Sequence, residues 1–140
     1  MENVDLIKEA IKAQKNSYSP YSKYPVGACI QTKDGKLFYG CNIENSAYGV
    51  SICGERTALF SAVAEGYSEF DKIAVVGGKL NDFAFPCGVC RQALSEFAPN
   101  IEVVVGKYDK NKDLIIQSYK LSELLPHSFG SKNMAGNLKY

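Results

Sequence analysis

Two short stretches of the chain place cysteines beside charged residues in a pattern that could do chemistry. The first reads "SICGERTALF" at residues 51–60, and the second reads "FPCGVCRQAL" at residues 85–94. In each stretch a cysteine stands where a helix is expected to begin, just after a loop or strand. A helix N-terminus carries partial positive charge and free N–H groups, so it favours a thiolate over a thiol.

Two such helix ends facing one point would bring together the sulfurs of Cys53, Cys87 and Cys90. Three thiolates suit a zinc ion. A structural zinc site normally has four protein ligands, whereas a catalytic one keeps a coordination position for water. The sequence offers no convincing fourth ligand, because its single histidine, His127, lies far downstream. We therefore expect one zinc ion per chain in an open, catalytic site.

The charged residues beside these cysteines fit the same hypothesis. Three thiolates around a dication leave one net negative charge, which opposes the deprotonation of a water. Arg56 and Arg91 lie next to the expected ligands and would offset that charge. Glu55, two residues after Cys53, has a carboxylate that can take a proton from the water and pass it on. Glu55 is the expected catalytic residue.

Simpler interpretations exist for each part of the pattern. A lone CxxC is common in zinc ribbons and in redox motifs, although a ribbon needs a second CxxC that the sequence lacks. Glu55 and Arg56 could form an exposed ion pair worth under about 1 kcal/mol. The combination favours catalysis: 33 residues (54–86) separate the cysteine of CxE, Cys53, from the first cysteine of CxxC, Cys87, and a proline precedes Cys87. A structural zinc or redox module remains the alternative from a different class.

The other two cysteines, Cys29 and Cys41, lie in apolar, strand-like stretches, and we expect them to be core thiols. A disulfide framework is not expected in a reducing compartment, and the odd total of five cysteines argues against one as well. The start of the chain, "MENVDLIKEAIK", is charged and lacks the apolar centre of a signal peptide. These features predict a cytoplasmic protein.

Composition narrows the class of protein further. The chain has 140 residues, 46% of them hydrophobic, which predicts one globular domain over residues 1–140. The formal net charge is +1 and no basic run is present, so a nucleic acid polymer is not an expected partner. No stretch approaches the roughly 18 uninterrupted apolar residues that a membrane span requires. A small-molecule substrate fits best.

Apolar periodicity predicts the elements that would position the two cysteine segments. Helices are expected over 3–17, 53–65, 87–98 and 121–126, and strands over 25–32, 36–43, 72–78, 101–107 and 114–119. Two helices link successive strands, so right-handed crossovers should leave those strands as parallel neighbours. The predicted fold is α/β, a three-layer α/β/α sandwich around a mixed sheet of about five strands. Residues 130–140 are polar and should form a loose tail.

The sequence resembles the zinc-dependent cytidine deaminases, specifically the small branch whose zinc ligands are all cysteines. "CGERTA" (53–58) and "PCGVCRQ" (86–92) match the signature of that superfamily. The likeness extends to "YSPYSKYPVGA" (18–28), "GCNIENSAYG" (40–49) and "ELLPHSF" (123–129). It implies hydrolytic deamination of cytidine, and of deoxycytidine, to uridine or deoxyuridine and ammonia in pyrimidine salvage.

The resemblance also implies roles for further residues. Asn42 and Glu44 match positions that hold the ribose hydroxyls, and Tyr24 matches a base-pocket position that is usually Phe. Tyr48 and Phe129 match positions that complete active sites across the subunits of a homotetramer. From the residues alone, Asn42 and Glu44 could equally be polar turn residues, and Phe129 a core aromatic.

The sequence departs from the family pattern at two other positions. Gly54 stands where Ala is common, and His127 stands where small residues are frequent, close to Phe129. The nearest rival function keeps the chemistry and changes the substrate, as in a blasticidin-type or other aminopyrimidine nucleoside deaminase. The stretch "NIEN" (42–45) favours a plain ribonucleoside.

Overall fold

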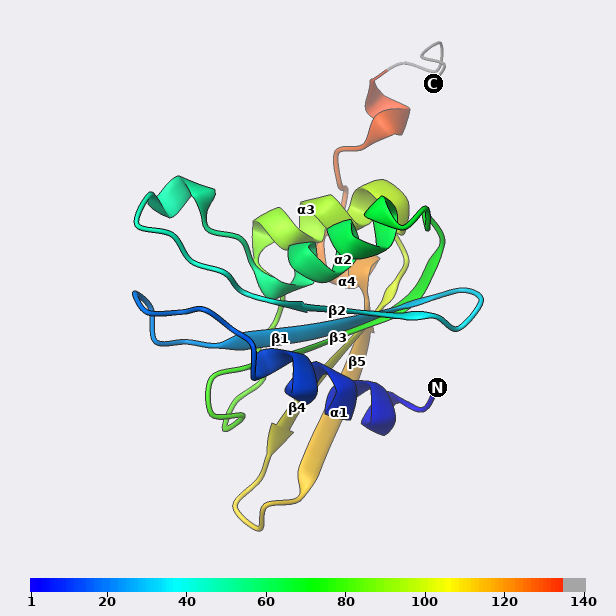
Figure 1. Ribbon diagram of the computed structural model, residues 1–140. Helices are drawn as coiled ribbons and strands as arrows, with labels where there is room; N and C mark the ends of the chain where they lie inside the picture. Colours follow the sequence, from blue (N-terminus) through cyan, green and yellow to red (C-terminus); the bar gives the residue numbers. More distant parts are fainter. Residues whose placement is uncertain (135–140) are drawn as a thin grey trace.

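Five strands and four helices follow the order that periodicity predicts (Figure 1). The structure is a computed structural model that describes residues 1–134. The strands are β1 (Val26–Thr32), β2 (Leu37–Cys41), β3 (Phe70–Gly77), β4 (Glu102–Tyr108) and β5 (Leu114–Lys120). The helices are α1 (Asn3–Gln14), α2 (Gly54–Ala64), α3 (Gly88–Phe97) and α4 (Leu121–Leu124), with 3₁₀ turns η1 (Tyr48–Val50) and η2 (Ser131–Asn133).

The five strands form one mixed sheet in the order β2-β1-β3-β4-β5. Strands β3 and β4 are parallel neighbours joined through α3, as the crossover rule predicts. The crossover through α2 meets only half of the prediction. Strand β1 lies between β2 and β3 and pairs antiparallel with both, so β2 and β3 run in the same direction but are not neighbours.

Helices cover both faces of the sheet, which confirms the three-layer α/β/α architecture (Figure 1). Successive residues of β3 alternate between the two cores, because strand side chains alternate between faces. Ala74 and Val76 join Leu6 and Ile7 under α1. Another core lies beneath α2 and α3, and its largest fully buried members are Ile30, Leu59, Ile73, Val75, Leu94, Val103, Val105 and Leu121.

Helix α3 buries only part of its apolar side. Leu94 and Cys90 are buried, but Val89 is 59% exposed, and Phe97 is also exposed. The first turn directs Cys90 rather than its neighbour into the protein, and position 90 carries one of the predicted ligands. Of the tail expected over 130–140, residues 131–133 form η2, and residues 135–140 lie outside the described part. Over residues 1–134, no helix combines the length and the apolar character needed to cross a bilayer.

Gly40 allows α2 to lie directly against β2. A Cβ at this position would stand 2.3 Å from the Ala58 nitrogen and 2.3 Å from the Gly54 carbonyl oxygen. Both are backbone atoms of α2, so the helix would have to move away. Because Gly54 directly follows Cys53, the position of this helix also sets the position of one predicted ligand.

We therefore expect Gly40→Ala to lower the free energy of unfolding by about 1–3 kcal/mol, the usual cost of overpacking, and to weaken zinc binding. Denaturant unfolding and zinc analysis would measure both effects. Gly49→Ala is the control, because no atom lies within 4 Å of the added Cβ. Equal stability of the two variants would contradict the close packing of α2 on β2.

Candidate active site

The three predicted ligands lie at the N-termini of two helices, as the sequence predicts. Cys53 is the N-cap residue of α2, Cys87 is the N-cap residue of α3, and Cys90 lies in the first turn of α3. Both N-cap residues have extended backbone conformations, and neither makes a side-chain capping hydrogen bond. Their sulfurs are therefore available near the positive ends of two helix dipoles.

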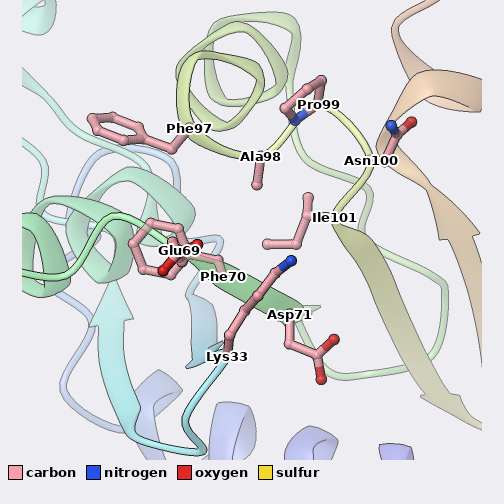
Figure 2. Close-up of a pocket in the computed structure, with 9 residues that line it drawn as sticks. All are labelled: Lys33, Glu69, Phe70, Asp71, Phe97, Ala98, Pro99, Asn100 and Ile101. Atoms are coloured by element: carbon pink, nitrogen blue, oxygen red, sulfur yellow. The ribbon is translucent and has the colours of Figure 1, made fainter.

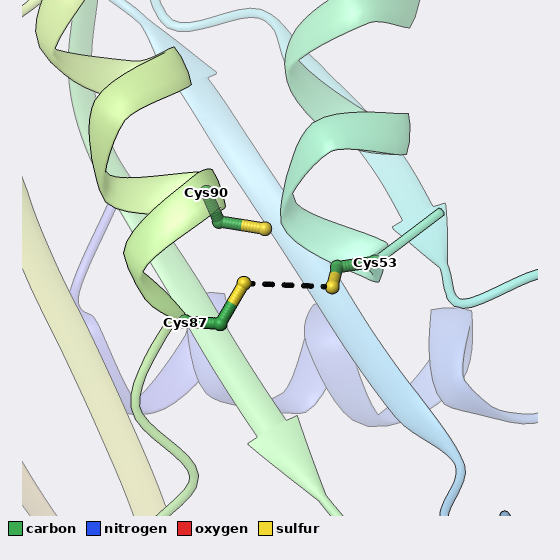
Figure 3. Close-up of side chains that lie close together, drawn as sticks. All are labelled: Cys53, Cys87 and Cys90. Atoms are coloured by element: carbon green, nitrogen blue, oxygen red, sulfur yellow. Dashed lines mark hydrogen bonds between the residues drawn. The ribbon is translucent and has the colours of Figure 1, made fainter. Parts of the chain in front are cut away.

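The three sulfurs form one compact cluster (Figure 3). All lie within 4.8 Å of one another, and the sulfurs of Cys53 and Cys87 are 3.7 Å apart. A zinc–sulfur distance of about 2.3 Å in a tetrahedral site gives a sulfur–sulfur spacing of about 3.8 Å. The observed separation thus fits zinc. Cys90 is buried and Cys87 is exposed, so the cluster reaches the surface.

The donor set also fits a zinc ion with an open coordination position. Among residues 1–134, these cysteines are the sole group of three or more cysteine, histidine or acidic side chains arranged to hold a metal. The hydrogen bond between Cys53 and Cys90 lowers the pKa of Cys53 to about 5 and raises that of Cys90. A dication that replaces the shared proton would leave both sulfurs as thiolates.

Glu55 lies in the first turn of α2, where its carboxyl is almost completely enclosed. It is 3% exposed, and its Oε1 has no hydrogen-bond partner within the described chain. Burial raises the pKa of the carboxyl to about 7, and the charge of Cys53 acts in the same direction. A buried carboxyl with a free oxygen and a pKa near neutrality is suited to accept and return a proton.

The two predicted arginines differ in their contacts. Arg56 donates from its terminal nitrogen to the Cys53 sulfur at 3.7 Å, which places positive charge against the thiolates. Arg91 instead donates to the carbonyls of Pro86 and Leu124, both at 2.7 Å. It thereby ties the loop before α3 to the end of α4. Arg56 is therefore the arginine in contact with a cluster sulfur, and a charge-compensating role for Arg91 stays a prediction.

Backbone pairing connects the segment that carries Asn42 and Glu44 to the segment that carries Cys53. Ile43 and Ile52 exchange two N–H to carbonyl hydrogen bonds of 3.0 Å, and Cys53 follows Ile52 directly. On the other side of Ile43, Tyr18 donates to the Asn42 carbonyl at 3.0 Å and accepts from the Glu44 N–H at 2.8 Å. The segment that contains Asn42 and Glu44 is therefore hydrogen-bonded directly to the segment that leads into Cys53.

The side chains of Asn42 and Glu44 bind the loop that precedes β1. Asn42 is buried, its Oδ1 accepts from the Ser17 hydroxyl and from the Val26 N–H, and its Nδ2 donates to the Tyr24 carbonyl at 2.9 Å. The Glu44 carboxylate accepts from the Ser22 hydroxyl. Sequence reasoning missed Ser17 and Ser22. Ser17 directly precedes the "YSPYSKYP" stretch and Ser22 lies within it, and a loop rich in serine and proline is typical of side-chain hydrogen bonds to nearby groups.

The Tyr24 ring packs on the end of β3. A Cβ at Gly77 would stand 2.5 Å from the Tyr24 hydroxyl oxygen, and one at Gly78 would stand 2.8 Å from a ring carbon. Burial raises the pKa of Tyr24, and the charges of Asp82 and Glu55 add to the shift. The phenol is therefore neutral at physiological pH and lies within electrostatic range of the Glu55 carboxyl.

The two aromatic residues predicted to serve a neighbouring subunit are exposed. Tyr48 is 75% exposed on η1 and stacks edge-on against Tyr21 at 5.8 Å, whereas Phe129 is 60% exposed beyond α4. The Phe129 carbonyl accepts from the Gln92 side chain at 2.8 Å, which ties its segment to α3. Figure 1 shows η1 and the segment after α4 extending from the protein body in different directions.

A hollow of about 350 Å³ lies away from the cysteine cluster (Figure 2). It is formed by the start of β3 and by the residues that follow α3, whereas Cys87 and Cys90 lie at the other end of that helix. Ten helical residues span about 15 Å. The hollow therefore belongs to a different part of the molecule from the cluster, and its lining residues are Lys33, Glu69, Phe70, Asp71, Phe97, Ala98, Pro99, Asn100 and Ile101.

Comparison with known proteins gives consistent results. Residues 1–107 match the family model described as "Cytidine and deoxycytidylate deaminase zinc-binding region". A cytidine deaminase from Halalkalibacterium halodurans is 43% identical over 135 residues, covering 96% of this chain and 98% of that protein. The crystal structure of cytidine deaminase from Burkholderia pseudomallei has a TM-score of 0.82 and 44% identity, covering 92% of this chain and all of that one. A blasticidin-S deaminase from Bacillus cereus is 30% identical over 132 residues, covering 89% and 90% of the two chains.

Proposed function

The chain belongs to the cytidine and deoxycytidylate deaminase family, and from this premise we propose that it is a zinc enzyme that hydrolyses cytidine to uridine and ammonia. The observation that carries this conclusion is the enclosed Glu55 carboxyl, with an oxygen free of partners, beside three clustered cysteines. Deoxycytidine is the second substrate that we propose, and a place in pyrimidine salvage follows from this chemistry.

Cys53, Cys87 and Cys90 would hold the zinc ion. When bound, zinc supplies Lewis acidity and lowers the pKa of a coordinated water to about 7. The positive ends of α2 and α3 favour the thiolate forms of the ligands. Arg56, in contact with the Cys53 sulfur, offsets part of the negative charge of the three thiolates and so helps the water to lose its proton.

Glu55 moves the protons of the reaction. It first takes a proton from the attacking water and delivers it to the ring nitrogen N3, while the water oxygen bonds to the adjacent carbon C4. The resulting carbon is tetrahedral and bears both the new hydroxyl and the amine. Glu55 then transfers the hydroxyl proton to the amine, the carbon–nitrogen bond breaks, and ammonia leaves with uridine as the other product. One carboxyl with a pKa of about 7 acts as base and acid in turn.

Asn42 and Glu44 are proposed to hold the ribose, and Tyr24 to line the base pocket. One hydrogen of the Asn42 amide nitrogen is donated to the Tyr24 carbonyl. The other remains free, so toward a substrate this nitrogen can only donate. The Glu44 carboxylate can only accept. A sugar hydroxyl can satisfy both at once, accepting from Asn42 and donating to Glu44. This polarity supports a nucleoside, whose sugar carries such a hydroxyl, as the substrate.

The test of the proposed function is the reaction itself. Purified protein loaded with zinc should lower the ultraviolet absorbance at wavelengths where cytidine absorbs more than uridine, and should release ammonia and uridine in equal amounts. Blasticidin S, offered in parallel at the same concentration, should react far more slowly. Faster turnover of blasticidin S would favour the rival deaminase, and zinc without any deamination would favour a structural module.

We further infer a homotetramer with shared active sites in a reducing, cytoplasmic compartment. The exposure of Tyr48 and Phe129 supports the first inference, since large exposed aromatic side chains are typical of contact surfaces. The five cysteines, all free, support the second.

Shared sites predict complementation between two impaired variants. Phe129→Ala should lose at least about tenfold in activity while each chain keeps its fold, as circular dichroism would show, because the ring is exposed in the single chain. Glu55→Gln should be nearly inactive. Co-expressed, the two should recover activity above the sum of the separate variants, because a Glu55→Gln chain supplies Phe129 to its neighbour. Simple averaging of the two activities, or a fully active monomer in solution, would contradict shared sites.

A further inference from the structure

Ser22 occupies a central place in the hydrogen bonds around the proposed ribose residues. Its hydroxyl donates to Oε2 of Glu44, and the same hydroxyl oxygen accepts the Tyr24 N–H at 3.1 Å. Its own N–H and that of Tyr21 both donate to Oε1 of Glu44 at 3.0 Å. One serine thus connects two residues that are proposed to contact the substrate, Glu44 and Tyr24.

These contacts hold the Glu44 carboxylate in one orientation. A carboxylate has about four acceptor positions, and the loop occupies three of them, which leaves one for an outside hydroxyl. The hydrogen bond from the Ser22 hydroxyl, followed by that from the Ser22 N–H, lowers the pKa of Glu44. The carboxylate is therefore ionised at neutral pH and serves as an acceptor only.

We propose that Ser22 is a positioning residue for substrate binding: its hydroxyl fixes the Glu44 carboxylate so that the remaining acceptor position faces a ribose hydroxyl. The inference rests on the proposed function, in which Glu44 and Asn42 hold the sugar. Without this hydroxyl, Oε2 of Glu44 and the Tyr24 N–H both lose a partner, and the carboxylate can rotate away.

The expected effect is on binding rather than on the chemical step. Ser22 and Glu44 act on the sugar, which is bound before and during the reaction, whereas Glu55 and the cysteines act on the base. A contact present in both the ground state and the transition state affects KM with little change in kcat. For Ser22→Ala we expect the KM for cytidine to rise about five- to tenfold, with kcat within about twofold of the natural enzyme.

The decisive comparison uses a nucleoside without ring hydroxyls. 2′,3′-Dideoxycytidine can be measured as a competitor of cytidine whether or not it reacts, and it offers Glu44 neither a 2′- nor a 3′-hydroxyl. Ser22→Ala should change its inhibition constant by less than about twofold, and Ser22→Thr, which keeps the hydroxyl, should restore the KM for cytidine. In a Glu44→Ala background, Ser22→Ala should have a much smaller effect on the KM for cytidine, because the hydrogen bond to Glu44 is already absent and only the one from the Tyr24 N–H remains to be lost.

Ser46→Ala is the matched control. Ser46 lies two residues after Glu44 and is exposed, and its side chain makes no hydrogen bond within the described chain. An equal loss for cytidine and for the dideoxy competitor, or an unchanged KM, would overturn the role of Ser22 while leaving the proposed function intact. Failure of the natural protein to deaminate cytidine would overturn both.

Discussion

Replacing Glu55 by Gln should lower the kcat for cytidine by roughly 100- to 10,000-fold, the range expected for the loss of acid–base catalysis, while zinc content stays unchanged. Glutamine has nearly the same shape as glutamate but cannot accept and return the proton. The carboxyl is not one of the three clustered ligands, so the metal keeps its full set of sulfurs. Loss of cytidine absorbance and elemental analysis of the same sample would measure both quantities.

Glu65→Gln provides the matched control for this substitution. Glu65 follows the last residue of the same helix, α2, and is exposed to solvent. It should retain the natural kcat and zinc content. A Glu55→Gln variant that binds zinc and still deaminates cytidine at close to the natural rate would show that Glu55 is not the proton carrier.

Cys87→Ala should abolish both zinc binding and deamination, the second large effect that we expect. Two remaining sulfurs cannot hold the ion as three do. Cys87 is the most informative ligand to replace, because it is exposed, whereas Cys90 is fully buried and its truncation would also leave a cavity. Loss of zinc from the Cys87 variant can therefore be separated from a loss of folding, which circular dichroism would monitor.

Cys29→Ala and Cys41→Ala are the controls for the cysteine substitution. Cys29 is buried beneath α1, and desolvation raises the pKa of its thiol to about 12, which makes it a core thiol. Both variants should keep one zinc per chain and the natural activity. Full zinc occupancy in Cys87→Ala, or loss of zinc from either control, would contradict the assignment of the three ligands.

Much of the site could be predicted because its parts are local. The spacing of apolar residues predicts helices α2 and α3. The positions where these helices begin place Cys53, Cys87 and Cys90 at positive helix ends. Two such ends on one face of a sheet need only approach each other for three sulfurs to meet. Strands β3 and β4 could be predicted equally well, since each contains a continuous buried apolar run.

The pairing order of the strands could not be read in this way. Periodicity identifies a strand but says nothing about which strand lies beside it. The crossover through α2 leads from β2 to β3. Strand β3 does not lie beside β2 but on the other side of β1, which forms a hairpin with β2. The insertion of β1 makes that edge of the sheet antiparallel.

Side-chain hydrogen bonds between residues far apart in the chain also could not be predicted from the sequence. Nothing in the pattern of residues indicates that Arg91 turns to the Leu124 carbonyl rather than to a thiolate. The contacts of Ser17 with Asn42 and of Ser22 with Glu44 join residues more than twenty positions apart. These contacts depend on how the loop before β1 packs against the segment after β2, which is a property of the folded chain.

The most direct test of the whole account is a zinc titration of the metal-stripped protein, with cytidine deamination measured at each step. We expect no activity without metal, a linear rise as zinc is added, and saturation at one zinc per chain. Activity that is already full without zinc, or one bound zinc per chain with no conversion of cytidine to uridine, would contradict a catalytic zinc site formed by Cys53, Cys87 and Cys90.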